Sequence, residues 1–215
     1  MKMNLSELNR SPLRIAFIGG GVNSAVGKVH VAASQLDGKW KLVSGCFSRS
    51  TSENEYSGNV YNISPTRVYS DWKTLLYQEQ GKIDAVAVLT PTPTHLKIIS
   101  HCIKYKYPII SEKALVHTYE DAVKLSNLIN GNNCYLAVTY NYAGYPMIRE
   151  LRDIISRNTL GNILHFEAEM PQEGYLRRNA KDEPIHPQSW RQKDGKIPTL
   201  YLDLGVHLHQ LIYYL

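Results

Sequence analysis

Three side chains in this sequence have the types and positions that proton transfer requires. Lys113 follows Glu112 directly after a predicted strand, and a partly desolvated lysine near another cation has a lowered pKa. Asp203 and His207 are four residues apart, which puts both on one face of a helix, and a histidine exchanges protons near neutral pH. A surface lysine and a helix-surface Asp–His pair are the commoner occurrences of these residues. A metal site would need a third ligand, and no third ligand can be placed from the sequence.

An apolar run near the N-terminus, Leu-Arg-Ile-Ala-Phe-Ile at residues 13–18, ends in three glycines. This pattern predicts a buried strand, a tight turn and a helix. Without Cβ atoms such a turn can lie against a pyrophosphate, and the N-terminus of the next helix favours phosphates. Gly19 and Gly21 fit the first two positions of G-x-G-x-x-G, but Ser24 holds the third and Gly27 comes three residues later. A glycine-rich turn without a ligand is therefore the alternative interpretation.

Strands and helices are predicted to alternate along the first two thirds of the chain. Apolar runs bounded by turn residues predict six strands, at residues 13–18, 40–47, 68–69, 83–89, 108–110 and 135–139. Helical periodicity predicts helices at residues 26–36, 71–80, 96–105 and 118–130, and a short helix starting near residue 50. Ser70 or Asp71 and Thr118 are the expected N-caps, and Gly131 is expected to end its helix. This alternation is typical of an α/β fold with a doubly wound parallel sheet.

Polar or glycine-rich clusters follow five of these strands, at residues 19–21, 48–49, 90–95, 112–113 and 140–145. Ligands of such sheets bind at the carboxyl ends of the strands. Ser48 and Arg49 occupy the tip of the second predicted strand, which meets the adenine ribose in dinucleotide-binding folds. An acidic residue at this tip binds the ribose 2′-hydroxyl, whereas an arginine accommodates a 2′-phosphate. Because this tip carries no acid, NADP stands beside NAD as a candidate cofactor. A surface arginine is the alternative for Arg49.

The sequence changes character after Pro146. It predicts a helix at residues 147–158, an antiparallel strand at 163–170, a charged and proline-rich loop at 171–198 and a helix at 200–215. We expect an N-terminal arm at residues 1–12, a dinucleotide-binding domain at 13–142 and an incomplete substrate domain at 143–215. The second domain is expected to be incomplete because the chain stops on an apolar half-turn without a cap.

The composition argues against several classes of protein. A chain of 215 residues suits one large domain or one and a half. The net charge of +5 includes no basic run, so nucleic-acid binding is not expected. No stretch approaches the ~18–20 apolar residues of a membrane span, so no membrane partner is expected. Cys46, Cys102 and Cys134 are odd in number and widely spaced, which fits buried thiols in a reducing cytoplasm.

Taken together, the motifs resemble the Gfo/Idh/MocA oxidoreductases, the relatives of glucose–fructose oxidoreductase and inositol dehydrogenase. The resemblance runs from about Leu13 to the end of the chain. It is carried by the glycine turn, Thr90-Pro91 with His95, Glu112-Lys113, the segment 139–146, Trp190-Arg191, and Asp203 with His207. It implies a Rossmann domain followed by the start of an α/β substrate domain. It also implies hydride transfer between NAD or NADP and a hydroxyl of a sugar, cyclitol or sugar derivative.

The resemblance also implies roles for individual residues. Those expected to line the cofactor are Gly19, Gly21, Ser48, Arg49, Thr90, Pro91, His95 and Glu112. The expected catalytic set is Lys113, Asp203 and His207. Those expected to shape the substrate pocket are Tyr140, Asn141, Tyr145 and Trp190. A full-length form is expected to be a homo-oligomer, and no metal is expected.

The sequence departs from the family pattern in three places. Ala114 stands where the family has a proline after Glu-Lys, residues 196–201 replace a glycine-rich lead-in, and most of the second domain's sheet has no counterpart. A homologue that binds the dinucleotide without turnover is therefore the alternative function. For His95, a helix-start histidine that packs on its own loop is the alternative role, and His209 is expected to be structural.

Overall fold

The computed structural model describes residues 11–174, 176–187 and 189–215. The chain divides into two compact units, of which the first ends at Val138 and the second spans Thr139–Leu215. Most of the expected arm at residues 1–12 lies outside the described residues. Among the described helices, none is long and apolar enough to cross a membrane.

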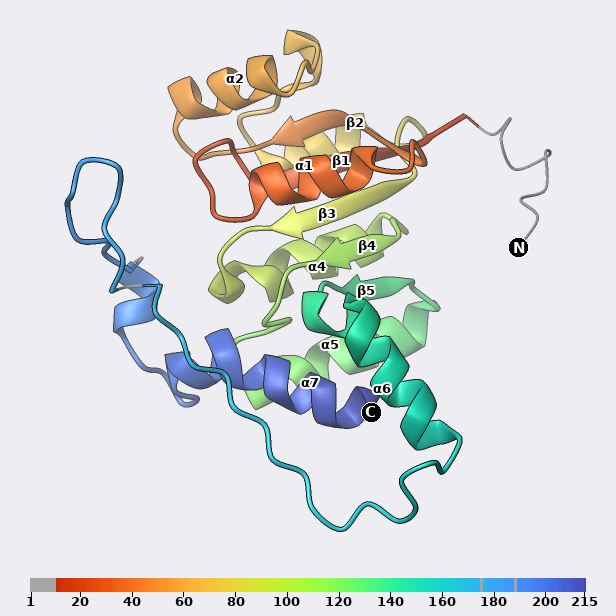
Figure 1. Ribbon diagram of the computed structural model, residues 1–215. Coiled ribbons are helices and arrows are strands. Elements are labelled where there is room, and N and C mark those ends of the chain that lie inside the picture. The colour runs from red at the N-terminus through yellow and green to blue at the C-terminus, as the bar shows by residue number, and fades with distance from the viewer. Residues whose placement is uncertain (1–10, 175, 188) are drawn as a thin grey trace. The chain divides into compact units, whose positions relative to one another are not determined.

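The described part of the first unit contains one parallel sheet of five strands in the order β2-β1-β3-β4-β5 (Figure 1). The strands are β1 (Leu13–Gly19), β2 (Trp40–Cys46), β3 (Ala85–Leu89), β4 (Ile109–Ser111) and β5 (Leu136–Val138). The helices between them are α1 (Gly27–Gln35), α2 (Thr51–Val60), α3 (Trp72–Gln78), α4 (His95–Lys104) and α5 (Tyr119–Asn132). The strand order reverses direction beside β1, as in a doubly wound Rossmann sheet, and the predicted fold class is confirmed.

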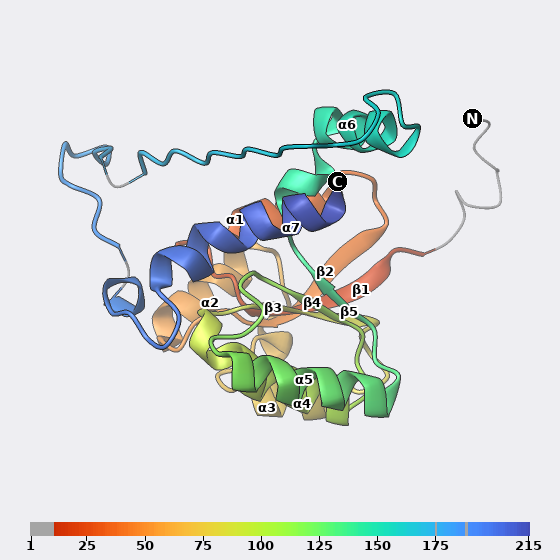
Figure 2. The same ribbon diagram turned by 90° about the horizontal axis from the view of Figure 1, so that it is seen from below.

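Both faces of the sheet are covered, so its central strands are apolar throughout. Val86 and Val88 of β3 pack in the cluster that holds α3, α4 and α5 against one face. Ala85 and Ala87 pack in the cluster on the opposite face. Figure 2 shows α1 on one side of the strands and α3, α4 and α5 on the other. This arrangement explains why residues 83–89 read as a continuous apolar run instead of an alternating one.

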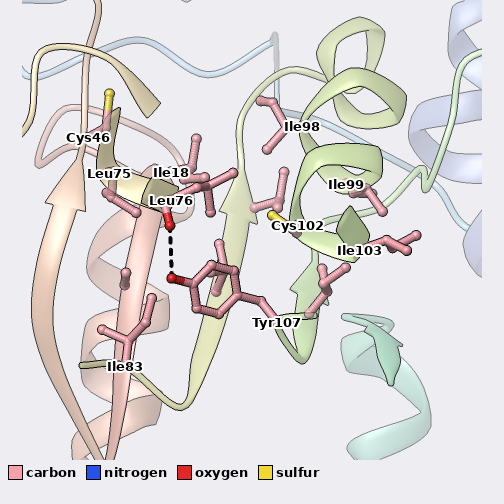
Figure 3. Close-up of a cluster of buried hydrophobic side chains, with 14 of the residues drawn as sticks. Ile18, Cys46, Leu75, Leu76, Ile83, Ile98, Ile99, Cys102, Ile103 and Tyr107 are labelled. Atoms are coloured by element: carbon pink, nitrogen blue, oxygen red, sulfur yellow. Dashed lines mark hydrogen bonds between the residues drawn. The ribbon is translucent and has the colours of Figure 1, made fainter. Parts of the chain in front are cut away.

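Cys46 and Cys102 lie inside the larger of these clusters (Figure 3). Burial raises the pKa of the Cys46 thiol to about 11 and that of Cys102 to about 12. Cys134 is only half-buried, and burial raises the pKa of its thiol as well. The hydroxyl of Tyr107, also in this cluster, donates to the carbonyl oxygen of Leu76 at 2.9 Å. The three thiols are free, and the predicted burial is confirmed for Cys46 and Cys102 but is wrong for Cys134.

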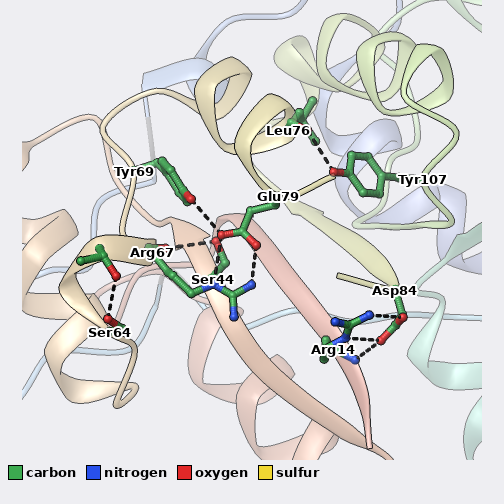
Figure 4. Close-up of polar contacts among 10 residues, drawn as sticks. Arg14, Ser44, Ser64, Arg67, Tyr69, Leu76, Glu79, Asp84 and Tyr107 are labelled. Atoms are coloured by element: carbon green, nitrogen blue, oxygen red, sulfur yellow. Dashed lines mark hydrogen bonds and ion pairs between the residues drawn. The ribbon is translucent and has the colours of Figure 1, made fainter. Parts of the chain in front are cut away.

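A buried carboxylate joins the end of α3 to the segment that precedes this helix (Figure 4). Glu79, the C-cap of α3, is fully buried. It accepts from Arg67 Nε at 3.0 Å, from the Tyr69 hydroxyl at 2.8 Å and also from Arg67 Nη2. Burial raises the pKa of Glu79, but the hydrogen bonds from Arg67 and Tyr69 outweigh it, so the pKa is lowered overall.

Three predictions about the first unit need correction. Residues 68–69 form no strand, because the 3-10 turn Pro65–Arg67 and the N-cap Asp71 leave room only for an isolated bridge between Val68 and Gly45. Gly131 does not end α5, since the helix continues to Asn132 and Asn133 takes the left-handed conformation at φ 47°. The short helix expected near residue 50 extends to Val60. The N-caps Asp71 and Thr118 are confirmed, because each side chain accepts from a backbone N–H in the first turn.

The second unit begins with the 3-10 turn Asn141–Gly144, followed by α6 (Pro146–Ser156). A π-helical turn, Tyr201–Gly205, leads into α7 (Val206–Tyr214). The guanidinium of Arg152 in α6 lies 4.3 Å from the ring centre of Tyr214 in α7. The strand expected at residues 163–170 is wrong: this segment is irregular, because an antiparallel strand requires a pairing partner and the described residues of this unit supply none.

Candidate functional site

The register of the sheet brings three chemically distinctive segments to one edge of the first unit. Gly19 at the end of β1 pairs with Leu89 at the end of β3, and Val88 pairs with Ser111 at the end of β4. The glycine turn, the segment from Thr90 and the Glu112-Lys113 pair therefore begin directly after neighbouring strand ends. This edge of a parallel sheet is where ligands bind in doubly wound folds.

The glycine turn is built from backbone that side chains would obstruct. Gly19 and Gly20 have φ values of +82° and +72°, which L-residues rarely adopt. A Cβ on Gly19 would lie 2.7 Å from the Leu89 carbonyl oxygen, and one on Gly21 would lie 3.0 Å from Ser57 Oγ. A bare backbone turn just before the N-terminus of α1 supplies the donors and the positive dipole end that a pyrophosphate requires. The residues present therefore fit a dinucleotide.

Gly27 completes this turn, a role that the sequence analysis missed although it noted the position of this glycine. It is the first residue of α1, and a Cβ there would lie 2.1 Å from the Gly20 carbonyl oxygen and 2.6 Å from that of Gly21. Ser24 Oγ accepts from the Gly27 N–H at 2.8 Å, so the serine holds the start of the helix. Gly27, and not residue 24, permits the close contact between helix and turn for which the motif uses its third glycine.

Ser48 and Arg49 follow β2, as expected, but an acid is also present near this tip. Ser48 Oγ donates to Glu53 Oε2 at 3.3 Å and accepts from the Ser50 N–H at 3.1 Å. Glu53 lies in the first turn of α2, five residues beyond Ser48, so it escapes a search confined to the strand tip. The segment from Ser48 to Glu53 therefore carries both a guanidinium group, on Arg49, and a carboxylate, on Glu53.

The segment after β3 is tied to the segment after β4 by His95. This residue, the first of α4, is fully buried. Its Nε2 lies 2.7 Å from the Thr90 carbonyl oxygen and its Nδ1 lies 3.0 Å from that of Ala114. Burial lowers the pKa of His95, and these carbonyl contacts oppose that shift. The side chain thus packs on its own loop, which is the alternative role that the sequence left open for His95. Thr90 and Pro91 lie directly after the end of β3.

Glu112 and Lys113 follow β4, and the carboxylate of Glu112 is held at both oxygens. Its Oε1 lies 2.7 Å from His30 Nε2 in α1, and its Oε2 accepts from the Lys113 backbone N–H at 3.2 Å. The peptide bond between Lys113 and Ala114 is cis. His30 is a second residue that the sequence analysis missed. Its only sequence signal is its place one turn beyond Gly27 on the helix that starts at the glycine turn.

In the second unit, the predicted histidine lies among tyrosine rings. His207 is in the first turn of α7 and nearly buried. Its ring meets Tyr142 edge-on at 4.8 Å and Tyr140 at 5.9 Å between centres. Burial raises the pKa of Tyr140, which also lines a surface hollow of about 700 Å³ together with residues of α7. Tyr145 packs edge-on against Tyr142 at 5.6 Å.

The predicted aspartate is held by an arginine. Arg191 Nη2 donates to Asp203 Oδ1 at 3.2 Å, and Arg191 Nε lies 3.1 Å from Oδ2. The same guanidinium lies 4.7 Å from the ring centre of Trp190, so it links two predicted site residues. Asp203 is in the π-helical turn before α7, and Asn141 opens the 3-10 turn that carries Tyr142. Within the described residues, no three His, Cys, Asp or Glu side chains form a group that could hold a metal ion.

Comparisons with known proteins agree with this geometry. A family model described as "Oxidoreductase family, NAD-binding Rossmann fold" matches residues 13–140. The chain is 25% identical over 217 residues to an uncharacterized oxidoreductase, YfiI, of Bacillus subtilis (strain 168), covering 98% of this chain and 55% of the relative. It is 27% identical over 147 residues to levoglucosan dehydrogenase of Pseudarthrobacter phenanthrenivorans, covering 65% of this chain and 36% of that protein.

A solved structure shows the same relationship. The crystal structure of an inositol dehydrogenase homolog complexed with NADH and myo-inositol, from Azotobacter vinelandii, is 35% identical with a TM-score of 0.68. The match covers 71% of this chain and 41% of that one. The chain thus spans about half the length, or less, of the relatives that it matches.

Proposed function

Because the chain belongs to the oxidoreductase family with the NAD-binding Rossmann fold, we propose that it binds NAD or NADP at the carboxyl edge of its sheet. We propose that the bound cofactor exchanges hydride with a hydroxyl of a sugar, cyclitol or sugar derivative. The observation that supports this most is the adjacency of the three strand ends carrying the glycine turn, Thr90 and Glu112-Lys113. Residues 13–142 would form the cofactor domain and 143–215 the start of the substrate domain.

The residues of the chain would divide the work between binding and proton transfer. Backbone groups at Gly19 and Gly21 would bind the pyrophosphate, and Ser48 and Arg49 the adenosine ribose. Thr90, Pro91 and Glu112 would lie along the nicotinamide half, with His95 acting through the two loops that it joins. Bound NAD or NADP would supply the hydride acceptor.

Lys113 would hydrogen-bond the reacting hydroxyl and carry its proton as the carbonyl forms. His207 would exchange that proton with solvent, and Asp203 would orient the substrate from its contact with Arg191. Holding the donor carbon close to the nicotinamide would be the main contribution of the protein to the rate.

The substrate class follows from the names of relatives and from the predicted pocket residues. One relative is a levoglucosan dehydrogenase, and one solved relative was crystallised with NADH and myo-inositol. Tyr140, Tyr145 and Trp190 would offer ring faces to the C–H surface of such a polyhydroxylated ring, and Asn141 would offer donors and acceptors for its hydroxyls. We also propose a cytoplasmic location, which suits the free thiols, and a homo-oligomer for a full-length form.

Two measurements test this proposal. Calorimetric titration with NADH and NADPH should show saturable binding of at least one of them, and a chain that binds neither has no cofactor site. Hydride transfer to NAD or NADP, followed by absorbance over a panel of sugars and cyclitols, should then fall at least ~100-fold in Lys113→Ala, the size of a lost acid–base group.

Lys104→Ala, an exposed lysine in the last turn of α4, is the matched control and should retain full turnover. Equal turnover in Lys113→Ala would remove the lysine from the mechanism. Cofactor binding by the wild-type chain with no turnover on any substrate would instead favour a dinucleotide-binding module without catalysis.

A further inference from the structure

Helix α2 buries a polar face where an apolar one is usual. Asn54 and Ser57 are only 3% and 2% exposed, and Tyr61 follows as the C-cap residue of the same helix. The spacing of three and then four residues places these side chains along one face of a helix. Buried polar side chains of this kind are costly unless each finds a partner, so their partners indicate what the face does.

Two of the three side chains bind the glycine turn. Ser57 Oγ accepts from the Val22 N–H at 3.1 Å, and the Tyr61 hydroxyl donates to the Gly20 carbonyl oxygen at 3.0 Å. The Tyr61 ring is fixed in turn by an edge-on contact with Phe47 at 5.4 Å. The turn is therefore held from α2 on both sides of Gly21.

The third side chain binds the tip of β2. Asn54 Oδ1 accepts from the N–H groups of Phe47 at 2.7 Å and Ser48 at 3.3 Å. Its Nδ2 donates to the Tyr69 carbonyl oxygen at 2.9 Å. One helix face thus reaches both the turn expected to bind the pyrophosphate and the tip expected to bind the adenosine ribose.

The packing around this face leaves little freedom for the helix to move. A Cβ on Gly58 would lie 2.4 Å from Val68 Cγ2, and one on Gly21 would lie 3.0 Å from Ser57 Oγ and 3.3 Å from the Phe47 carbonyl oxygen. Only small residues permit this approach, and a displacement of α2 would break the hydrogen bonds to both loops together.

We propose that Asn54, Ser57 and Tyr61 are positioning residues that fix the spacing of the two dinucleotide-binding loops and so set the affinity for the cofactor. This inference rests on the proposed function. Loops that are already ordered in the free protein lose less conformational freedom on binding. Removing one hydrogen bond from α2 should therefore weaken binding of the diphosphate without removing any group that touches the cofactor.

The test uses Tyr61→Phe and Ser57→Ala, which delete one hydroxyl each at the glycine turn. Their matched controls are Tyr56→Phe and Ser52→Ala, at exposed positions of the same helix. The Kd of NADH is measured by fluorescence, and the Kd values of ADP and adenosine by competition with it. Each turn variant should bind NADH and ADP about fivefold more weakly, as expected for one lost neutral hydrogen bond, while adenosine binding and both controls stay unchanged.

The ratio of the adenosine to the ADP affinity separates positioning from general damage. A variant that merely unfolds more readily weakens both probes alike, and that result would overturn the inference. NADH affinities equal to wild type in both turn variants would overturn it too, although the proposed function would stand. If the wild-type chain binds neither NADH nor NADPH, the proposed function fails first and this inference fails with it.

Discussion

Gly27→Ala is the substitution for which the geometry of the glycine turn makes the sharpest prediction. The new Cβ would lie 2.1 Å from the Gly20 carbonyl oxygen and 2.6 Å from the Gly20 carbonyl carbon. Both atoms belong to the backbone, so neither can rotate out of the way as a flexible side chain would. Helix α1 and the turn must instead separate by about 1.3 Å, the difference between 2.1 Å and ordinary contact at 3.4 Å.

The cost of this separation can be estimated from the packing. Forcing extra volume into a well-packed site costs ~1–3 kcal/mol, and the rigid backbone partners place Gly27→Ala at the upper end. The higher helix propensity of alanine returns ~0.5–1 kcal/mol, so we expect a net loss of ~2 kcal/mol in unfolding free energy. If the displaced turn loses even one backbone hydrogen bond to the charged pyrophosphate, worth ~1.5–3 kcal/mol, the Kd of NADH should rise at least ~10-fold.

Gly131→Ala is the matched control, because it makes the same substitution within α5. A Cβ there meets nothing within 4 Å, so the substitution should raise stability by ~0.5–1 kcal/mol and leave NADH binding unchanged. Urea denaturation gives the stability of each variant, and fluorescence titration gives the Kd. The reasoning is refuted if Gly27→Ala binds NADH within about threefold of wild type, or if Gly131→Ala is destabilised as much.

Two further predictions concern buried titratable groups and their dependence on pH. Glu79→Gln should lower the unfolding free energy by ~2–3 kcal/mol at pH 7, because hydrogen bonds from Arg67 to a charged acceptor are lost. The folded pKa of Glu79 is lowered, so the stability difference between wild type and variant should persist above pH 4.5, the ordinary pKa of a glutamate, and shrink as the pH falls below it. Urea midpoints from pH 7 to 3 check this, and a gap that does not change with pH would contradict it. The wild type should lose stability as the pH falls below 6.5, because the lowered pKa of His95 means that the unfolded chain takes up the proton first. His95→Gln should not show this loss, and identical stability profiles of the two proteins between pH 7 and 5 would exclude the effect.

The sheet and its functional edge follow from the sequence because they depend on local patterns. Apolar runs predict the strands, and in a parallel sheet every strand presents the residues that follow it at the same edge. Thr90 and Glu112 could therefore be assigned to one edge without knowledge of any contact between them. The N-caps Asp71 and Thr118 were predictable for the same reason, since capping depends on a few consecutive residues.

The features that sequence reasoning missed depend on partners distant in the chain. Residues 163–170 alternate like a strand, but pairing requires a neighbour that the described second unit does not supply. Gly27 looks like a displaced motif glycine until its contact with Gly20 is seen. The role of His30 can be recognised only from its contact with Glu112, 82 positions away in the sequence.

The three free thiols allow the unfolding of the native chain to be followed by chemical labelling. A thiol must ionise and meet the reagent before it can be alkylated, and burial raises the pKa values of Cys46 and Cys102 to about 11 and about 12. Both thiols should resist maleimide until their surroundings open, whereas the half-buried Cys134 should react earlier. Cys46 lies in edge strand β2 and Cys102 in α4. The order in which these sites acquire label, read by mass spectrometry, would report which part of the fold opens first without any engineered cysteine.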